Sequence, residues 1–152
     1  MLKINKKSVK CSLFFKPQKK DLLKIFESVL SYLNIEQDFE ISVVFCNDSF
    51  IHKYNKQYRN KDKATNVLSF CSDEFMKESG YLGDIIISLE TIQREANEQS
   101  KTNQNHLTHI FTHSILHLLG YDHEIEDQRI NMEDVEIKIL ANLGVSNPYE
   151  IE

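Results

Sequence analysis

The chain has 152 residues, of which 41% are hydrophobic, and this length and apolar content predict one compact domain, residues 1–152, that buries its own core. Its three cysteines are odd in number and form no Cys-x-x-Cys pair, which argues against a disulfide framework or a thiolate metal site and favours a reducing cytoplasm. The early apolar stretch at residues 13–15 is too short for a signal peptide or a membrane span, and the formal net charge of −5, taken alone, discourages binding to nucleic acid.

The first half of the chain alternates strand and helix patterns. After an N-terminal strand, Pro17 precedes apolar residues spaced three and four apart, which predict an amphipathic helix that ends near Leu33. The β-branched run at residues 41–46 predicts a strand. We then expect Asp48 to cap a helix that reaches Tyr58, with aromatic side chains on one face and lysines on the other.

The second half becomes helical after two more strands. We place these strands at residues 66–71 and 82–88, with a polar loop between them that ends near Gly80. Helices are expected at residues 89–99, 103–119 and 126–143. Gly120 and Gly144 stand where a residue with positive φ would end a helix. The order of elements predicts an α+β fold, in which helices cover a small mixed β-sheet of about four strands.

Histidines form the strongest pattern in the sequence, since five of the six lie between residues 106 and 123. His113 and His117 are four residues apart, so on a helix both imidazoles project from one face and can reach the same ion. Gly120 can adopt the positive φ that reverses the chain and lets His123 return toward them. The spacing therefore predicts a metal site with these three histidines as its ligands.

Three protein ligands leave the fourth tetrahedral position open, as in catalytic rather than structural zinc sites. Zinc lowers the pKa of bound water to about 7 and can polarise a phosphoryl oxygen, and both effects suit phosphodiester hydrolysis. We therefore expect one Zn²⁺ per chain, although imidazole also suits other divalent transition metals.

Two neighbouring residues could support the ligands. His109 lies one turn before His113, and we assign it to ligand support or to the cleft wall. Asp122 could hold an imidazole N–H and fix its tautomer, although a solvated turn aspartate is an equal alternative. We expect His106 at the surface.

The histidine spacing also resembles the zinc-binding helix of metzincin proteases, so the expected metal-binding helix in the C-terminal half is zincin-like. Those proteases place a glutamate directly after the first histidine as general base. Ser114 occupies that position and cannot accept a proton as a carboxylate does, which disfavours a metallopeptidase. A carboxylate from elsewhere could revive this hypothesis, and Asp84 is the candidate, although it could equally be structural.

Three separated blocks carry a second resemblance. Residues 113–123 resemble the signature of the YbeY family of bacterial rRNA maturation endoribonucleases, usually His-Gly-x-Leu-His-Leu-x-Gly-Tyr-Asp-His, with Ser114 in place of the glycine. Residues 55–70 are similar to its arginine-containing loop and the strand that follows, and residues 82–85 form the third block. Asn66 stands where the family often has aspartate. The resemblance covers nearly the whole chain.

This resemblance implies zinc bound by the three histidines, a cleft role for Arg59, and single-stranded or ribosomal RNA as substrate. We take Arg59 and His113 as the catalytic residues. The guanidinium of Arg59 can bind phosphate through two hydrogen bonds and stabilise charge that develops on its oxygens. The expected activity is a metal-dependent endoribonuclease in maturation of the 16S rRNA 3′ end and in ribosome quality control. A zinc-stabilised rRNA-binding assembly factor that does not cut is the alternative.

Basic residues gather in the first part of the chain, since residues 1–63 hold 13 Lys and Arg against 7 Asp and Glu, whereas residues 64–152 hold 5 against 16. Such asymmetry allows a basic patch on an acidic protein. We expect the RNA-binding residues to be Lys53, Lys56, Arg59, Lys61 and Lys63. Tyr54 or Tyr58 could stack a base, although helical spacing favours a core position. The alternative for Arg59 is a surface ion pair, for example with Asp62.

Overall fold

The computed structural model describes residues 2–11 and 15–150, so most of the apolar stretch 13–15 lies outside the described residues. In chain order the elements are β1 (Lys3–Ser8), α1 (Lys19–Tyr32), β2 (Glu40–Cys46), α2 (Asp48–Arg59), β3 (Val67–Cys71), α3 (Glu74–Glu78), β4 (Tyr81–Ser88), α4 (Leu89–Glu98), α5 (Asn103–Leu118) and α6 (Glu126–Asn142). Within these ranges no helix is both long enough and apolar enough to cross a bilayer.

The strands form one four-stranded sheet in the order β1-β2-β4-β3. β1, β2 and β4 are parallel neighbours, whereas β3 runs antiparallel to β4. This mixed sheet, flanked by helices, confirms the expected α+β class. The polar loop expected before Gly80 contains the short helix α3, which begins where the Asp73 side chain accepts a hydrogen bond from the Met76 backbone N–H at 2.8 Å.

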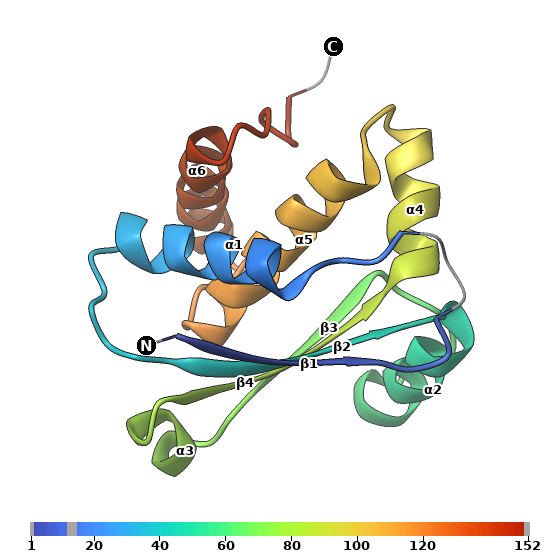
Figure 1. The fold of residues 1–152 in the computed structure, drawn as a ribbon, viewed down its shortest axis with the longest axis horizontal. Helices are drawn as coiled ribbons and strands as arrows, with labels where there is room; N and C mark the ends of the chain where they lie inside the picture. The colour runs from blue at the N-terminus through green and yellow to red at the C-terminus, as the bar shows by residue number, and fades with distance from the viewer. Residues whose placement is uncertain (1, 12–14, 151–152) are drawn as a thin grey trace.

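Helices cover the two faces of the sheet unequally. Figure 1 shows α1, α4, α5 and α6 on one side and α2 on the other, with α3 at one end of the sheet. The main core lies under the larger helical layer, where α1 contributes the face predicted by its apolar spacing. A smaller apolar cluster, which includes Ile51 and Leu68, lies between α2 and the opposite face.

The start of α2 differs from expectation by one residue. Asn47, not Asp48, is the cap, and its side-chain oxygen accepts a hydrogen bond from the Phe50 backbone N–H at 2.9 Å. Asp48 is the first helical residue, and its carboxylate accepts hydrogen bonds from the hydroxyls of Ser88 at 2.6 Å and Thr91 at 2.5 Å. Asp48 therefore joins α2 to the start of α4, a long-range contact that the local pattern does not show.

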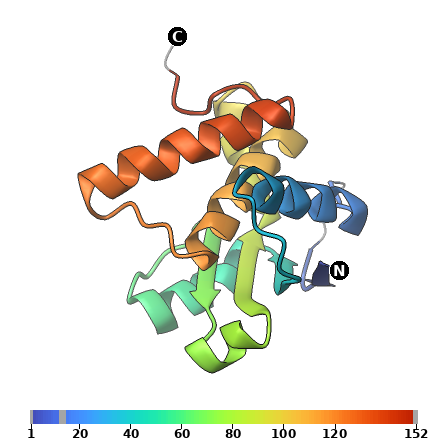
Figure 2. The ribbon, with the colours of Figure 1, turned by 90° about the vertical axis from the view of Figure 1, so that its left-hand side faces the viewer.

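Helix α5 lies against the sheet and, as Figure 2 shows, α6 crosses it on the side away from the strands. Gly83 permits close packing here, because its φ is +146° and an added Cβ would lie 2.2 Å from the Phe70 carbonyl oxygen and 3.0 Å from Leu118 Cδ2. Gly120, with φ of +102°, ends the helical segment as predicted and turns the chain back toward α5.

Candidate metal centre

The three predicted ligands come together at the end of α5. His113 and His117 lie one turn apart on the helix, and His123 returns from the turn that follows Gly120. One side-chain nitrogen from each histidine lies within 4.8 Å of the others. The ring centroids are 4.7 Å apart for His113 and His117, 4.7 Å for His117 and His123, and 5.6 Å for His113 and His123.

Hydrogen bonds fix the tautomers of two of these rings. His113 donates from Nδ1 to Glu136 Oε2 at 3.0 Å, and His117 donates from Nδ1 to the Tyr121 carbonyl oxygen at 3.1 Å. Because a carbonyl and an ionised carboxylate can only accept, both rings carry the proton on Nδ1 when they are neutral. Their Nε2 lone pairs then face each other at 3.1 Å.

Two facing lone pairs repel each other unless a cation lies between them. Bonds of roughly 2.0–2.1 Å at a tetrahedral angle place two zinc-bound nitrogens about 3.3 Å apart, close to the observed separation. Burial, followed by the neighbouring His113 and His123, lowers the pKa of His117 to about 4, which keeps the ring neutral as a ligand must be. The donor set therefore fits a divalent transition metal.

Glu136 is the residue of this site that the sequence analysis missed. It lies on α6, and its side chain is 0% exposed. Its Oε1 is 2.8 Å from His109 Nε2, and its Oε2 accepts hydrogen bonds from His113 and, at 2.9 Å, from the Tyr149 hydroxyl. Burial raises the pKa of Glu136, but the close His109 and His113 imidazoles outweigh it and bring the pKa to about 2. The carboxylate is therefore ionised at neutral pH.

The remaining histidines of α5 are also held by the protein. His109 lines the cavity described below and contacts both Glu136 and the Tyr149 ring, whose centroid is 5.7 Å from its own. His106 was expected at the surface, and this prediction was wrong because α4 packs across the start of α5. The His106 side chain is 2% exposed, and its Nε2 lies 2.9 Å from Glu95 Oε1.

Asp122 organises the turn that carries His123. Its carboxylate accepts hydrogen bonds from the backbone N–H groups of His123 at 2.6 Å and Glu124 at 3.1 Å. The distance from Asp122 Oδ1 to His123 Nδ1 is 4.0 Å, beyond hydrogen-bonding range. Asp122 thus holds the backbone of His123 and not its imidazole.

A cavity of about 920 Å³ adjoins the three histidines, and Arg59, Lys61 and Lys63 line the same cavity. Arg59 donates from Nη2 to the Ser69 carbonyl oxygen at 2.8 Å, and its guanidinium carbon lies 4.9 Å from the centre of the Phe70 ring. The three histidines and the basic side chains from the end of α2 and the loop that follows it therefore share one cavity.

The remaining predicted residues of this segment lie outside the cavity lining. Lys53 and Lys56 are exposed on α2, and Asp62, the partner considered for Arg59, contacts His52 Nε2 at 2.7 Å. The Tyr54 ring is half-buried between Phe50 and Tyr58. Tyr58 is 54% exposed, so it is the more accessible of the two tyrosines.

The model of the family described as Endoribonuclease YbeY matches residues 3–144. This chain belongs to the YbeY endoribonuclease family. Proteins named Endoribonuclease YbeY are 46% identical over 135 residues in Acinetobacter baumannii, covering 85% of each chain, and 44% identical over 138 residues in Agrobacterium fabrum, covering 83% of this chain and 81% of the relative. The solution structure of TM1509 from Thermotoga maritima has the same fold, with a TM-score of 0.59 and 23% identity over 97% of this chain and 99% of that one.

The departure from the YbeY signature at position 114 is accommodated inside α5. The Ser114 side chain is buried, and its hydroxyl donates to the Ile110 carbonyl oxygen at 2.9 Å. Asp84, the carboxylate considered for a peptidase, accepts a hydrogen bond from the Tyr81 hydroxyl at 2.8 Å and is not among the residues that line the histidine cavity. Neither residue is placed to act as a base in that cavity.

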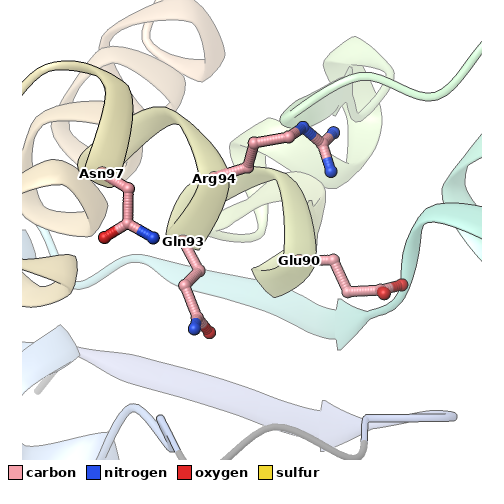
Figure 3. Close-up of a pocket in the computed structure, with 4 residues that line it drawn as sticks. All are labelled: Glu90, Gln93, Arg94 and Asn97. Atoms are coloured by element: carbon pink, nitrogen blue, oxygen red, sulfur yellow. The ribbon is translucent and has the colours of Figure 1, made fainter.

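A second hollow, of about 300 Å³, lies on α4 and shares no lining residue with the histidine cavity. Figure 3 shows its four lining side chains, which all come from this one helix. Arg94 is the cation among them, and it is already held by Asp48 at 3.2 Å and by the Thr91 hydroxyl at 3.0 Å. Arg94 therefore helps to join α2 to α4 at this hollow.

Proposed function

We propose that this chain is a zinc-dependent, single-strand-specific endoribonuclease that acts in rRNA maturation at the 3′ end of 16S rRNA and in ribosome quality control. Its substrate would be RNA of the small ribosomal subunit. The observation that carries the proposal is the convergence of three imidazoles, two with fixed tautomers, on a cavity that Arg59 also lines. The relatives named Endoribonuclease YbeY support RNA cleavage as the reaction.

His113, His117 and His123 would hold the metal, and the hydrogen bonds behind the first two rings keep their Nε2 atoms unprotonated and aimed at it. A bound zinc ion supplies a Lewis acid and a means of activating water near neutral pH. The chain contributes the rigid placement of these ligands on a helix that is packed into the core, and rigid placement preserves reactive geometry.

Arg59 would bind the phosphate that is cut. A guanidinium has five N–H donors, and Arg59 uses one of them on the Ser69 carbonyl oxygen, which fixes the side chain against the cavity wall. Other N–H groups can then meet phosphoryl oxygens and stabilise the charge that develops there. Stacking on Phe70 further limits the motion of the guanidinium.

The lysines would extend this contact along the RNA backbone. Lys61 and Lys63 line the cavity, and Lys53 and Lys56 are exposed on α2, which leads into it. Their attraction to phosphate is electrostatic and independent of base sequence, so salt should weaken it strongly. Tyr58 presents the most exposed ring of this surface and would stack a base.

We place the enzyme in the cytoplasm. Cys11, Cys46 and Cys71 are all unpaired in the structure, as expected of a chain that works under reducing conditions. We also propose that residues 1–152 act as a single endoribonuclease domain, because the cavity is built from segments that span most of the sequence, from Asn55 to Tyr149.

Metal analysis combined with cleavage of single-stranded RNA tests the proposal. Wild type should contain about one zinc per chain and cut the RNA, whereas His117→Ala should lose both the metal and the activity. Arg59→Ala should retain zinc but cut roughly 10²–10³-fold more slowly. Arg129→Ala, which removes an exposed charge on α6 that pairs with Glu133, is the control and should behave as wild type.

A zinc-loaded wild type that binds RNA without cutting it would overturn catalysis and indicate an assembly factor instead. Arg59→Ala separates the two cases further, since in an enzyme it should reduce turnover more than affinity, whereas in a binding factor it should reduce affinity and its salt dependence.

A further inference from the structure

Three side chains from separate segments converge on the carboxylate of Glu136. His109 and His113 come from α5, and Tyr149 comes from the C-terminal segment that follows α6. The contacts are 2.8 Å from His109 Nε2 to Oε1, 3.0 Å from His113 Nδ1 to Oε2, and 2.9 Å from the Tyr149 hydroxyl to Oε2. Oε2 therefore accepts two hydrogen bonds, whereas Oε1 lies within ion-pair distance of His109 Nε2 without an aligned hydrogen bond, inside a residue that is fully buried.

A charged carboxylate in this position lowers the stability of the folded state. Its desolvation costs several kcal/mol by general estimates, and well-packed apolar residues often replace such groups without loss of stability. Glu136 also interrupts an apolar face of α6, where Met132, Ile139 and Leu140 are buried beside it. A role beyond packing is therefore indicated by its position directly behind a metal-site histidine.

The effect of Glu136 on His113 differs from that of the group behind His117. His117 donates to a neutral backbone carbonyl, whereas His113 donates to an anion. A carboxylate behind an imidazole fixes the tautomer, holds the ring plane and makes the opposite nitrogen a stronger donor to a metal. His113 is therefore the ligand whose orientation and donor strength depend on a side chain.

We propose that Glu136 is a positioning residue of the metal site, which orients His113 and strengthens its bond to the metal, and that Tyr149 in turn orients the Glu136 carboxylate. This inference rests on the proposed function only in requiring that the three histidines bind zinc. It adds α6 and the C-terminal segment to the site, neither of which supplies a ligand.

A second carboxylate–histidine pair, between Glu95 on α4 and His106 on α5, provides the matched control. Glu95 contacts His106 Nε2 at 2.9 Å and accepts a hydrogen bond from Asn66 Nδ2 at 3.0 Å, so like Glu136 it combines an imidazole contact with a neutral donor, although it has one imidazole neighbour where Glu136 has two. His106 is not among the three histidines that could hold a metal. Loss of charge at Glu95 should therefore alter the protein interior without altering the ligands.

The decisive measurement is zinc affinity, determined by competition with a chromogenic chelator for wild type, Glu136→Gln and Glu95→Gln. Glutamine keeps the size and an acceptor oxygen but removes the charge. We expect Glu136→Gln to bind zinc about 10–100-fold more weakly, the range typical of lost partners behind a ligand. Glu95→Gln should stay within about twofold of wild type, since it leaves the ligand partners in place.

A second readout needs no metal. In zinc-free wild type, ¹⁵N–¹H correlation spectra of the imidazoles should show His113 as the Nδ1–H tautomer, and Glu136→Gln should show a mixture of tautomers. Circular dichroism of the zinc-free proteins checks that each variant is folded. Should Glu136→Gln fail to fold, Tyr149→Phe takes its place, with an expected loss of zinc affinity of roughly two- to fivefold, as for one neutral hydrogen bond.

The results separate the two proposals. A folded Glu136→Gln that binds zinc as tightly as wild type overturns the role of Glu136. If Tyr149→Phe is used instead, wild-type zinc affinity in that variant has the same meaning. If wild type binds no zinc, the proposed function fails, and an unchanged His113 tautomer in Glu136→Gln then also rejects the positioning role. Weaker binding together with a mixed tautomer supports it.

Discussion

Two of the carboxylate–histidine contacts along α5, those of His106 and His113, are similar in geometry but differ in their surroundings. Near the start of the helix, Glu95 on α4 contacts the fully enclosed His106. Further along, Glu136 on α6 contacts His113, whose side chain is partly exposed toward the cavity. In each pair a carboxylate accepts from one ring nitrogen, so the hydrogen bond itself does not distinguish them.

The difference lies in the other ring nitrogen. His106 Nδ1 is buried without a hydrogen-bond partner, whereas His113 Nε2 faces His117 Nε2 across 3.1 Å. The first pair therefore joins α4 to α5 and serves the fold, while the second pair presents a lone pair to a shared site. The comparison teaches that a buried histidine pair becomes functional through what its free nitrogen meets.

Removal of each imidazole should separate these roles most strongly. His113→Ala should lower zinc affinity by more than about 100-fold, because one of three ligands is gone, and it should also lose about 1–3 kcal/mol of zinc-free unfolding free energy, because the buried Glu136 loses a donor. His106→Ala should keep zinc affinity but lose about 1–3 kcal/mol of unfolding free energy, because it removes a buried side chain and the imidazole that contacts the partly buried Glu95. Chelator competition and urea unfolding of zinc-free protein measure the two quantities. Equal zinc loss in both variants would contradict the distinction.

The Glu95 pair should also make stability depend on acid. Burial raises the pKa of Glu95, but hydrogen bonds from His106 and Asn66 lower it by more than burial raises it. The folded-state pKa therefore lies below the usual value of 4.5. A depressed carboxylate pKa contributes stability that is present above the unfolded pKa and is lost as pH falls through the folded pKa.

Wild type should therefore exceed Glu95→Gln in unfolding free energy by roughly 1–3 kcal/mol at pH 7, with the gap closing below about pH 4. Urea unfolding of zinc-free proteins between pH 7 and pH 3 measures this gap. A constant difference across that range would show that Glu95 acts through packing and not through its charge.

The sequence predicted the elements and the convergence of the three histidines well, because both depend on local spacing. Apolar periodicity located the helices, and the four-residue separation of His113 and His117 with Gly120 after them was sufficient to predict a converging third ligand. Membership of the YbeY family and the mixed sheet were likewise confirmed.

The partners of the histidines could not be predicted, because they come from other helices. The burial of His106 depends on α4, and the contact of His113 depends on α6, each of which packs onto α5 only in the folded chain. One signal was available for Glu136, since a lone glutamate between Met132 and Ile139 falls on the inward face of α6. A charged residue on an apolar face is a reason to search for a buried partner.

The neutral donor of each pair provides the finest test of the comparison. Asn66→Ala removes the amide that donates to Glu95, and it should reduce unfolding free energy by about 1 kcal/mol while leaving zinc affinity unchanged. Tyr149→Phe removes the hydroxyl that donates to Glu136, and its effect should instead be largest on zinc affinity. Urea unfolding and chelator competition on both variants give four values. If Asn66→Ala weakened zinc binding as much as Tyr149→Phe did, then strain would spread along α5, and the two carboxylates could not be treated as separate supports for fold and site.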